Sequence, residues 1–274
     1  MASSSAVTIG VAGALGRMGQ VVTAALDSRS EAQGDVTVSA LFDRVGTEGS
    51  LSGPRILTSA IEAIEASRVI IDFTLPKASA ALARSCAEPR AVGTVRPALI
   101  IGSTGFDDED EAMLAAAATQ IVIVRSGNFS LGVNMLLGLV RQAARALGPK
   151  AYDIEVLEAH HRRKIDAPSG TALMLGEAAA AGRGIDLASH SDRGRDGLTG
   201  PRKEGDIGFS VLRGGGIVGE HSVLFAAEDE ILTLSHSARD RGLFARGAVE
   251  AALWAVAQTK PGLYDMQDVL GLKA

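Results

Sequence analysis

The stretch from Glu158 to Leu173 gathers residue types that can do chemistry. It reads EAHHRRKIDAPSGTAL and places the adjacent His160 and His161 beside three cationic residues, ahead of an alanine-rich helical pattern. A protein core would not tolerate so much unpaired positive charge, and imidazoles exchange protons near neutral pH. The stretch therefore predicts a site that binds an anion and transfers a proton.

The same histidines are poor candidates for metal ligands. Adjacent residues of a strand point to opposite faces, so His160 and His161 would not converge on one ion. Cys86 is the only cysteine, which excludes an intramolecular disulfide and a Cys-based zinc site. We therefore expect no metal site.

The other three histidines are weaker candidates for chemistry. We expect His190 and His236 to be structural or solvated, and His221 is a candidate for an interface.

A second candidate site lies near the beginning of the chain. The apolar run VTIGVA leads into GALGRMG, in which Gly13, Gly16 and Gly19 are spaced three apart and a helix begins inside the motif. Glycines allow close approach to a pyrophosphate, and the helix N-terminus favours its charge. With a strand before the motif and a helix after it, the pattern predicts a dinucleotide site.

Asp43 and Arg44 stand at the end of the second expected strand, 24 residues beyond Gly19. An acidic residue there can bind the ribose hydroxyls of NADH, and a guanidinium can pair with the extra phosphate of NADPH or stack on adenine. A solvated Asp-Arg turn is the alternative. Having both residues favours use of either cofactor.

Small polar residues follow two further expected strands, in GSTGF (102–106) and SGNFS (126–130). Ligands of open parallel sheets bind at the carboxyl ends of the strands, where such residues can offer backbone groups to a nicotinamide and its ribose. Ordinary loop composition would look similar. We predict that both segments line the cofactor crevice.

The elements that position these sites follow from periodicity. From Val7 to Val124, short Val/Ile-rich runs alternate with helical patterns, which predicts a doubly wound parallel sheet covered on both faces, as in Rossmann-like α/β folds. After Phe129 we expect helices over 131–147 and 169–181 and a strand IEVLEAH. Three more strands, with hairpin turns at Gly214–Gly216 and Glu228–Asp229, complete a smaller α+β domain with a mixed or antiparallel sheet. A final helix over 241–257 could complete either domain.

The composition of the chain limits which classes of partner it can bind. The chain has 274 residues and 46% hydrophobic content, enough for two domains. A net charge of −5, two tyrosines and one tryptophan disfavour nucleic-acid binding. Neither a signal-peptide pattern at Met1–Ala6 nor a long apolar run is apparent, so we expect no membrane partner and a cytoplasmic location.

In order along nearly the whole chain, GALGRMG, IDFTLP, GSTGF, NFSLGVN, EAHHRRKIDAPSGTAL, IVGEHSVLF, ALW and DMQDVL resemble the pattern of one family, dihydrodipicolinate (4-hydroxy-tetrahydrodipicolinate) reductase. The resemblance implies NADH- or NADPH-dependent reduction of a cyclic dicarboxylate in the diaminopimelate route to lysine. It also implies a homotetramer, with residues 1–130 and 241–274 binding the dinucleotide and residues 131–240 binding substrate and assembling subunits. One departure is EPRAVGTVRP (88–97), which looks longer than usual.

The resemblance also assigns roles to residues. It implies that His160 is the proton donor, that His161 and Lys164 contact substrate, that Lys164 assists the acid chemistry, and that Gly170 and Thr171 hold a substrate carboxylate. The implied cofactor contacts are Gly13, Ala14, Leu15, Gly16, Arg17, Met18, Asp43, Arg44, Gly102, Ser103, Thr104, Ser126, Gly127, Asn128 and Phe129.

Physical chemistry supports these roles. A dicarboxylate needs two anion sites: Ser169, Gly170 and Thr171 open a helix whose N–H groups can bind one, and Lys164 with a His161 N–H can hold the other. Glu158 and Asp166 are expected to orient these groups. Two alternatives stay open: another dehydrogenase of the same cofactor class, such as an aspartate-semialdehyde or homoserine enzyme, and a nucleotide-sensing regulator without catalysis.

Overall fold

The computed structural model describes residues 6–44, 46–47, 49, 51, 57–90 and 95–273. The expectations for residues 1–5 and for residues 91–94 of the 88–97 loop lie outside these ranges. Within the described ranges, no helix is both long enough and apolar enough to cross a membrane.

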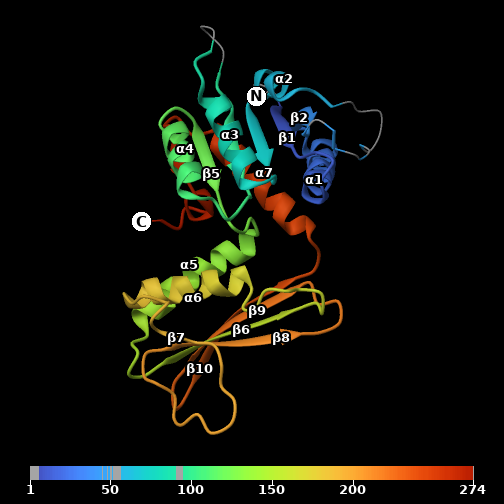
Figure 1. The fold of residues 1–274 in the computed structure, drawn as a ribbon. Coiled ribbons are helices and arrows are strands. Elements are labelled where there is room, and N and C mark those ends of the chain that lie inside the picture. Colours follow the sequence, from blue (N-terminus) through green and yellow to red (C-terminus); the bar gives the residue numbers. More distant parts are fainter. Residues whose placement is uncertain are drawn as a thin grey trace. The chain divides into compact units, whose positions relative to one another are not determined.

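Contacts within the chain divide it into two compact units (Figure 1). Unit 1 comprises Met1–Ser130 and Gly242–Ala274, and unit 2 comprises Leu131–Arg241. The last long helix therefore belongs to unit 1, a choice that periodicity had left open.

Unit 1 contains a parallel sheet. Its described residues form six strands in the order β11-β5-β4-β3-β1-β2, and every neighbouring pair is parallel. The short central strands are buried along their whole length, which is what coverage on both faces requires. The predicted doubly wound sheet is confirmed. The strands are β1 (Val7–Ala12), β2 (Val36–Phe42), β3 (Val69–Asp72), β4 (Ala98–Ile101), β5 (Val122–Arg125) and β11 (Gly262–Tyr264).

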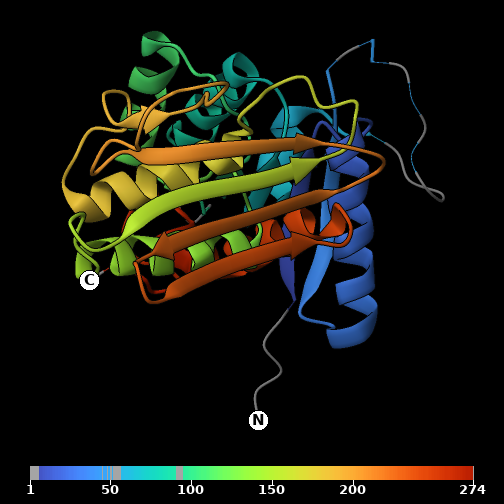
Figure 2. The same cartoon turned by 90° about the horizontal axis from the view of Figure 1, so that it is seen from below.

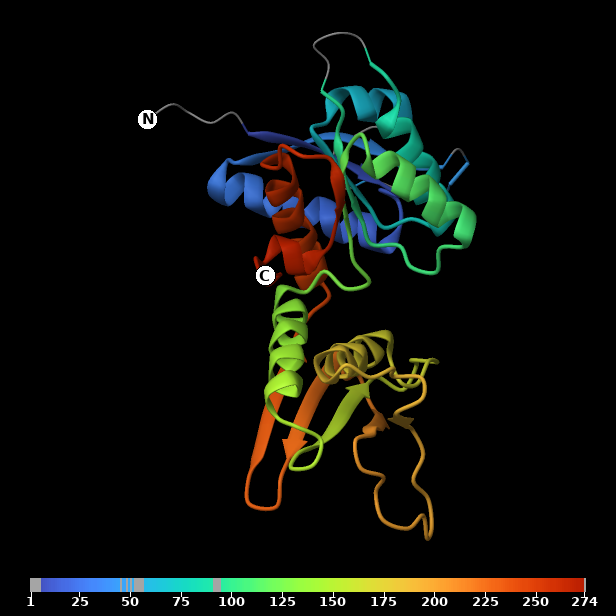
Figure 3. The ribbon, with the colours of Figure 1, turned by 90° about the vertical axis from the view of Figure 1, so that its left-hand side faces the viewer.

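Helices cover both faces of this sheet (Figure 3). Alternate strand residues point to opposite faces, so Ile71 packs in the core beneath α1, α7 and α8, whereas Ile70 packs in the core beneath α2, α3 and α4. The helices are α1 (Arg17–Gln33), α2 (Ala60–Ala66), α3 (Pro76–Ala87), α4 (Asp108–Ala118), α7 (Gly242–Val256) and α8 (Met266–Val269). The sequence did not predict α2, α8 or β11, each of which is too short for a clear periodicity.

Unit 2 has a mixed sheet with two helices on one face. Its described strands run in the order β10-β9-β6-β8-β7, with β6 parallel to β8 and antiparallel to β9. Figure 2 shows strands β8, β6, β9 and β10 with α5 and α6 behind them. The elements are α5 (Leu131–Ala146), β6 (Asp153–His160), α6 (Gly170–Arg183), β7 (Ser191–Asp192), β8 (Ile207–Arg213), β9 (Gly219–Ala226) and β10 (Ile231–Ala238).

One predicted strand connection is wrong. The turn at Gly214–Gly216 does not close a hairpin, because β6 lies between β8 and β9. Residues 214–218 instead carry the chain across the end of β6, a span of two strand spacings or roughly 10 Å, and the Gly214 N–H donates to the His160 carbonyl at 2.9 Å. The turn at Glu228–Asp229 does join the antiparallel pair β9 and β10, as predicted.

Candidate active site

The catalytic candidates lie at the end of the central strand of unit 2. Along β6, alternate residues from Ile154 to His160 are buried on the face that α5 and α6 cover. Glu158 and His160 are two residues apart and therefore share that face. The His160 Nδ1 lies 2.6 Å from the Glu158 Oε2. A carboxylate can only accept, so Nδ1 carries the hydrogen and Nε2 is left to exchange protons.

The Glu158 carboxylate is buried and fully engaged, with donors on both oxygens. Its Oε2 accepts from His160 and from Arg213 Nη1 at 2.7 Å, and its Oε1 accepts from Arg213 Nη2 at 2.8 Å and from the Ser169 N–H at 2.9 Å. Burial by itself would raise the pKa of Glu158, but these hydrogen bonds outweigh it and hold the pKa below its usual value. Glu158 therefore stays ionised beside His160.

His221 on β9 completes the buried cluster. Its ring meets the ring of His160 edge to face at 5.0 Å between centroids, and its Nε2 lies 3.2 Å from the Ser169 Oγ. Burial, with the nearby His160, lowers the pKa of His221 to about 4, so its ring is neutral at physiological pH. The cluster thus holds one imidazole beside a carboxylate and a second that carries no charge.

Residues 161–168 lead from β6 to α6 and carry the other predicted substrate contacts. Lys164 Nζ lies 2.8 Å from Asp166 Oδ1, and this pairing lowers the pKa of Asp166. Burial and neighbouring arginines lower the pKa of His161, and among the described residues its buried Nδ1 has no hydrogen-bond partner. A partly exposed ion pair is worth only about 0–1 kcal/mol, so Lys164 can exchange Asp166 for a substrate carboxylate at little cost.

Helix α6 begins beside this cluster. Ser169 is its N-cap, and the Ser169 Oγ accepts the N–H of Ala172 at 3.2 Å. The first N–H groups of a helix have no acceptor within it and favour anions. A Cβ built at Gly170 meets no atom within 4 Å, so the helix start is open at this position. The geometry fits a bound carboxylate.

The glycine-rich turn of unit 1 joins β1 to α1. Gly13 has φ +65°, and a Cβ there would lie 2.8 Å from Thr74 Cγ2. A Cβ at Gly19 would lie 2.8 Å from Ala14 Cα, so the turn and the helix can only pack this closely with glycine. Helix α1 begins after Gly16 without a side-chain cap, whereas α2, α4 and α8 each have a capping box. The turn therefore fits a pyrophosphate.

Asp43 and Arg44 follow β2, next to this turn. The Asp43 carboxylate accepts the N–H of Leu15 at 2.9 Å and that of Arg44 at 2.8 Å. Asp43 thus fixes the turn in addition to offering its remaining lone pairs to a ligand, while the Arg44 side chain is exposed. A role in holding the turn was not apparent from the sequence.

The segments after β4 and β5 end at the same edge of the parallel sheet as the turns after β1 and β2. The hydroxyls of Ser103 and Ser126 are buried and bond within the protein, to Ser79 and to the Asn128 carbonyl. The Phe129 ring is buried against Phe73 at 5.5 Å. These side chains therefore shape the loops, and a ligand would meet chiefly backbone there.

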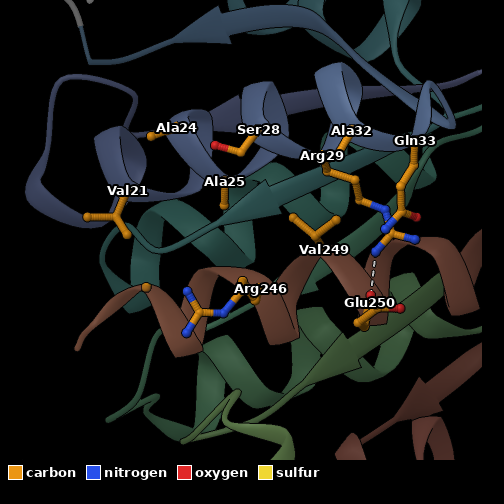
Figure 4. A pocket seen from close by; sticks show the side chains of 11 residues that line it. Val21, Ala24, Ala25, Ser28, Arg29, Ala32, Gln33, Arg246, Val249 and Glu250 are labelled. Atoms are coloured by element: carbon orange, nitrogen blue, oxygen red, sulfur yellow. Dashed lines mark hydrogen bonds and ion pairs between the residues drawn. The ribbon is translucent and has the colours of Figure 1, made fainter. Parts of the chain in front are cut away.

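A separate groove of about 530 Å³ lies between α1 and α7 in unit 1 (Figure 4). Its lining includes Val21 and Arg246, and an ion pair between Arg29 and Glu250 crosses one end. None of the predicted cofactor contacts lines it, so this groove is not the expected dinucleotide site.

Within each unit, the structure brings the predicted residues together. The catalytic and substrate candidates lie in unit 2, around the end of β6 and the start of α6, and the cofactor candidates lie in unit 1 at one sheet edge. Sequence reasoning missed Arg213 and did not place His221 beside His160, because both positions depend on strand order, for which the sequence carries no local signal.

The fold and the candidate sites indicate a class of protein: nicotinamide-dependent oxidoreductases that have a Rossmann-type unit and a second unit built on a mixed sheet. Two family models match the chain, "Dihydrodipicolinate reductase, N-terminus" over residues 7–129 and "Dihydrodipicolinate reductase, C-terminus" over residues 132–270. The chain belongs to the dihydrodipicolinate reductase family.

Proteins with similar sequences match this chain along nearly its full length. The 4-hydroxy-tetrahydrodipicolinate reductase of Caulobacter vibrioides is 64% identical over 270 residues, covering 98% of this chain and 99% of that protein. The 4-hydroxy-tetrahydrodipicolinate reductase of Dinoroseobacter shibae is 54% identical over 270 residues, covering 96% of this chain and 97% of that protein. The solved structure of a dipicolinate-bound dihydrodipicolinate reductase from Paenisporosarcina shares the fold, with a TM-score of 0.76 at 21% identity, covering 96% of this chain and 98% of that one.

These findings decide between the open alternatives. The chain is an oxidoreductase that reduces 4-hydroxy-tetrahydrodipicolinate with a nicotinamide dinucleotide. An acylating semialdehyde enzyme would need a reactive thiolate, but burial raises the pKa of the Cys86 thiol to about 12. The cluster around His160 is intact, which argues against a nucleotide sensor that has lost catalysis.

Proposed function

We propose that unit 2 binds the cyclic dicarboxylate substrate with His160 as the proton donor, and that unit 1 binds the dinucleotide. The observation that carries this proposal is the buried contact between His160 Nδ1 and Glu158, 2.6 Å long. It fixes one ring nitrogen as a donor to the protein and leaves the other for the substrate.

The chemistry requires such a donor. When bound, the reduced nicotinamide supplies a hydride. Loss of the 4-hydroxyl of the substrate as water gives a conjugated ene-imine, and addition of a hydride to it leaves an enamine-like carbanion equivalent, which must gain a proton. An imidazolium beside an ionised carboxylate is suited to give that proton near neutral pH, and Lys164 assists by holding the negative charge of the substrate nearby.

Two anion sites hold the substrate. The N-terminus of α6, at Ser169, Gly170 and Thr171, takes one carboxylate. Lys164 and a ring N–H of the neutral His161 take the other, with Asp166 released from the ammonium. Both sites flank the His160 cluster, because Ser169 bonds to Glu158 and Lys164 follows the strand end by four residues.

The dinucleotide is held by the edge of the sheet in unit 1. The turn Gly13–Met18 takes the pyrophosphate, Asp43 the ribose hydroxyls and Arg44 the adenine or its 2′-phosphate. Residues Gly102–Thr104 and Ser126–Phe129 offer backbone groups to the nicotinamide half. The fit rests on the positive φ of Gly13 and on the uncapped start of α1.

The activity is tested with the product of the preceding synthase step. Purified protein is mixed with that product and with NADH or NADPH, and oxidation of the nicotinamide is followed by absorbance. We expect turnover with both cofactors. Tight NADH binding without oxidation would instead indicate a nucleotide sensor.

Substitution of Arg44 by alanine tests the cofactor reading. We expect the Kd for NADPH to rise more than that for NADH, because a charge-assisted phosphate contact of roughly 1.5–3 kcal/mol is lost. Arg68, an exposed arginine at the opposite end of the parallel strands, provides the matched control Arg68→Ala. Equal losses for both dinucleotides would mean that Arg44 supports the adenine or the fold.

We also propose that the chain forms a homotetramer through the uncovered face of the sheet in unit 2. Leu157, Leu212 and Ile231 are 38%, 54% and 62% exposed, an unusual set of apolar side chains for a solvated sheet. Burying them between subunits would remove them from water.

The assembly is tested by sedimentation of the wild type and of Leu212→Glu. We expect a tetramer of the 28.2 kDa chain for the wild type and smaller species for the variant, since a charge would be desolvated at the interface. A monomeric wild type would contradict the proposal.

We further propose a cytoplasmic location, which cell fractionation checks.

A further inference from the structure

The Glu158 carboxylate lies between the proton donor and the helix start that is proposed to bind a substrate carboxylate. It accepts from His160 on one oxygen and from the backbone of Ser169 on the other. Its side chain is completely buried, and Arg213 bonds to both oxygens at once. We call Glu158, Arg213, His160 and Ser169 the Glu158 clamp.

We propose that the Glu158 clamp sets the position of the proton donor relative to the first turn of α6, with Glu158 and Arg213 as positioning residues. This inference rests on the proposed function, because it takes His160 as the donor and α6 as a carboxylate site. Neither Glu158 nor Arg213 needs to touch the substrate for the clamp to act.

The geometry supports a clamp rather than an ordinary ion pair. A guanidinium presents two parallel N–H groups to the two oxygens of a carboxylate, which fixes the carboxylate plane and not only its charge. Each Glu158 oxygen then has a fixed direction for its second donor: Nδ1 of His160 on one side and the N–H of Ser169 on the other. Rotation of the carboxylate would break both contacts together.

Strand order makes the arrangement possible. Arg213 is the last residue of β8 and pairs in register with His160, the last residue of β6. The Arg213 guanidinium also donates to the Asp166 carbonyl at 2.7 Å, which attaches the 161–168 loop to the same group. The clamp therefore links the strand end, the loop that carries Lys164 and the first residue before α6.

Two further contacts limit where the His160 ring can go. The His221 ring packs against it edge to face, and a Cβ at Gly219 would lie 3.2 Å from its Nε2. Because His221 is neutral, it restricts the ring without competing for the carboxylate. The titratable or charged groups near His160 include Glu158 on its own strand, Arg213 on β8, His221 on β9 and His161, the next residue in the chain.

The amide variant Glu158→Gln tests the clamp without changing side-chain size. Both carboxylate oxygens accept two N–H donors, but an amide has only one oxygen, so its NH₂ group must face either His160 and Arg213 or Ser169 and Arg213. One arm of the clamp is lost in either orientation. We expect kcat to fall roughly 10- to 100-fold, the range typical of lost partners that orient a functional histidine.

A pH profile separates positioning from simple destabilisation. If the clamp positions the proton donor, the pH profile of kcat in Glu158→Gln should differ from that of the wild type. A variant that has only lost stability should keep the wild-type profile. The Kd for pyridine-2,6-dicarboxylate, measured by calorimetry, should rise as well if the start of α6 shifts, while the Kd for NADH stays the same.

Arg202 provides a matched control. It lies at the other end of β6, pairs with Asp153 and Glu155, and its side chain is 19% exposed, against 20% for Arg213. Arg213→Met should reproduce the kinetic changes of Glu158→Gln, Arg213→Lys should restore part of the rate, and Arg202→Met should leave kcat and the pH profile unchanged. Melting temperatures of all variants show how much stability each has lost.

The outcomes distinguish the clamp from the function on which it rests. If Glu158→Gln and Arg213→Met behave like Arg202→Met, while His160→Gln loses most of its turnover, the clamp is wrong and the proton donor stands. If His160→Gln keeps wild-type turnover, the donor assignment itself fails. If Glu158→Gln does not fold, Arg213→Lys decides: a full rate with an unmoved pH profile overturns the clamp.

Discussion

His160→Gln should lower kcat by about 10²–10⁴-fold while changing the affinity for pyridine-2,6-dicarboxylate far less. The variant removes a proton donor that is needed chiefly in the transition state. A glutamine amide can still donate to Glu158, so the buried carboxylate keeps a partner at that position. The loss should therefore report catalysis more than folding.

The measurement is steady-state turnover between about pH 5 and pH 9, with inhibitor binding by calorimetry. If His160 is the proton donor, the pH dependence of turnover should differ between the variant and the wild type. His190→Gln is the control, because the His190 ring bonds to Ser189 and to the Asp186 carbonyl within its own loop. A variant with undiminished turnover across this pH range would refute the assignment.

Gly170→Val should raise the Michaelis constant for the dicarboxylate by about 10- to 100-fold, the effect of losing a charge-assisted contact of roughly 1.5–3 kcal/mol. The added Cβ meets no protein atom within 4 Å, so the substitution has open space where it begins. It would instead occupy the approach of an anion to the first N–H groups of α6. NADH affinity should be nearly unchanged, since the dinucleotide candidates all lie in unit 1.

Inhibition by pyridine-2,6-dicarboxylate makes the test specific. This planar compound presents two carboxylates, so it should compete with substrate in the wild type and lose potency in the variant. Gly170→Ala should have an intermediate effect. Gly194→Val is the control, since a Cβ at that glycine is also unobstructed in unit 2. Equal inhibitor affinity in folded wild type and Gly170→Val would place the carboxylate elsewhere.

The role of Arg213 explains why an active-site motif alone is incomplete. The segment Glu158–Leu173 supplies a proton donor, a carboxylate and a helix start within sixteen residues. Their relative positions depend on a guanidinium that arrives from a different strand, 55 residues after Glu158. A buried carboxylate without that partner would be costly, and it would tend to take up a proton.

Local sequence determined much of this protein. Runs such as VTIGVA and ALII are continuous and apolar, so they predict buried parallel strands, and the spacing of Gly13, Gly16 and Gly19 predicts a phosphate-binding turn. These signals are local, because a strand, a turn or a helix start is specified by residues that are neighbours in the chain. The same holds for the side-by-side placement of Glu158 and His160, which follows from the two-residue period of a strand.

Only the tertiary structure decided how strands combine. The glycine turn after Arg213 looks like a hairpin, yet β6 lies between β8 and β9, because pairing partners are chosen by the packing of the whole sheet and not by the connecting turn. That order brings Arg213 and His221 to His160 from opposite sides. It also places Asp43 against the backbone of Leu15, across 28 residues of chain. Such contacts depend on strand order, which hydrophobic periodicity does not encode.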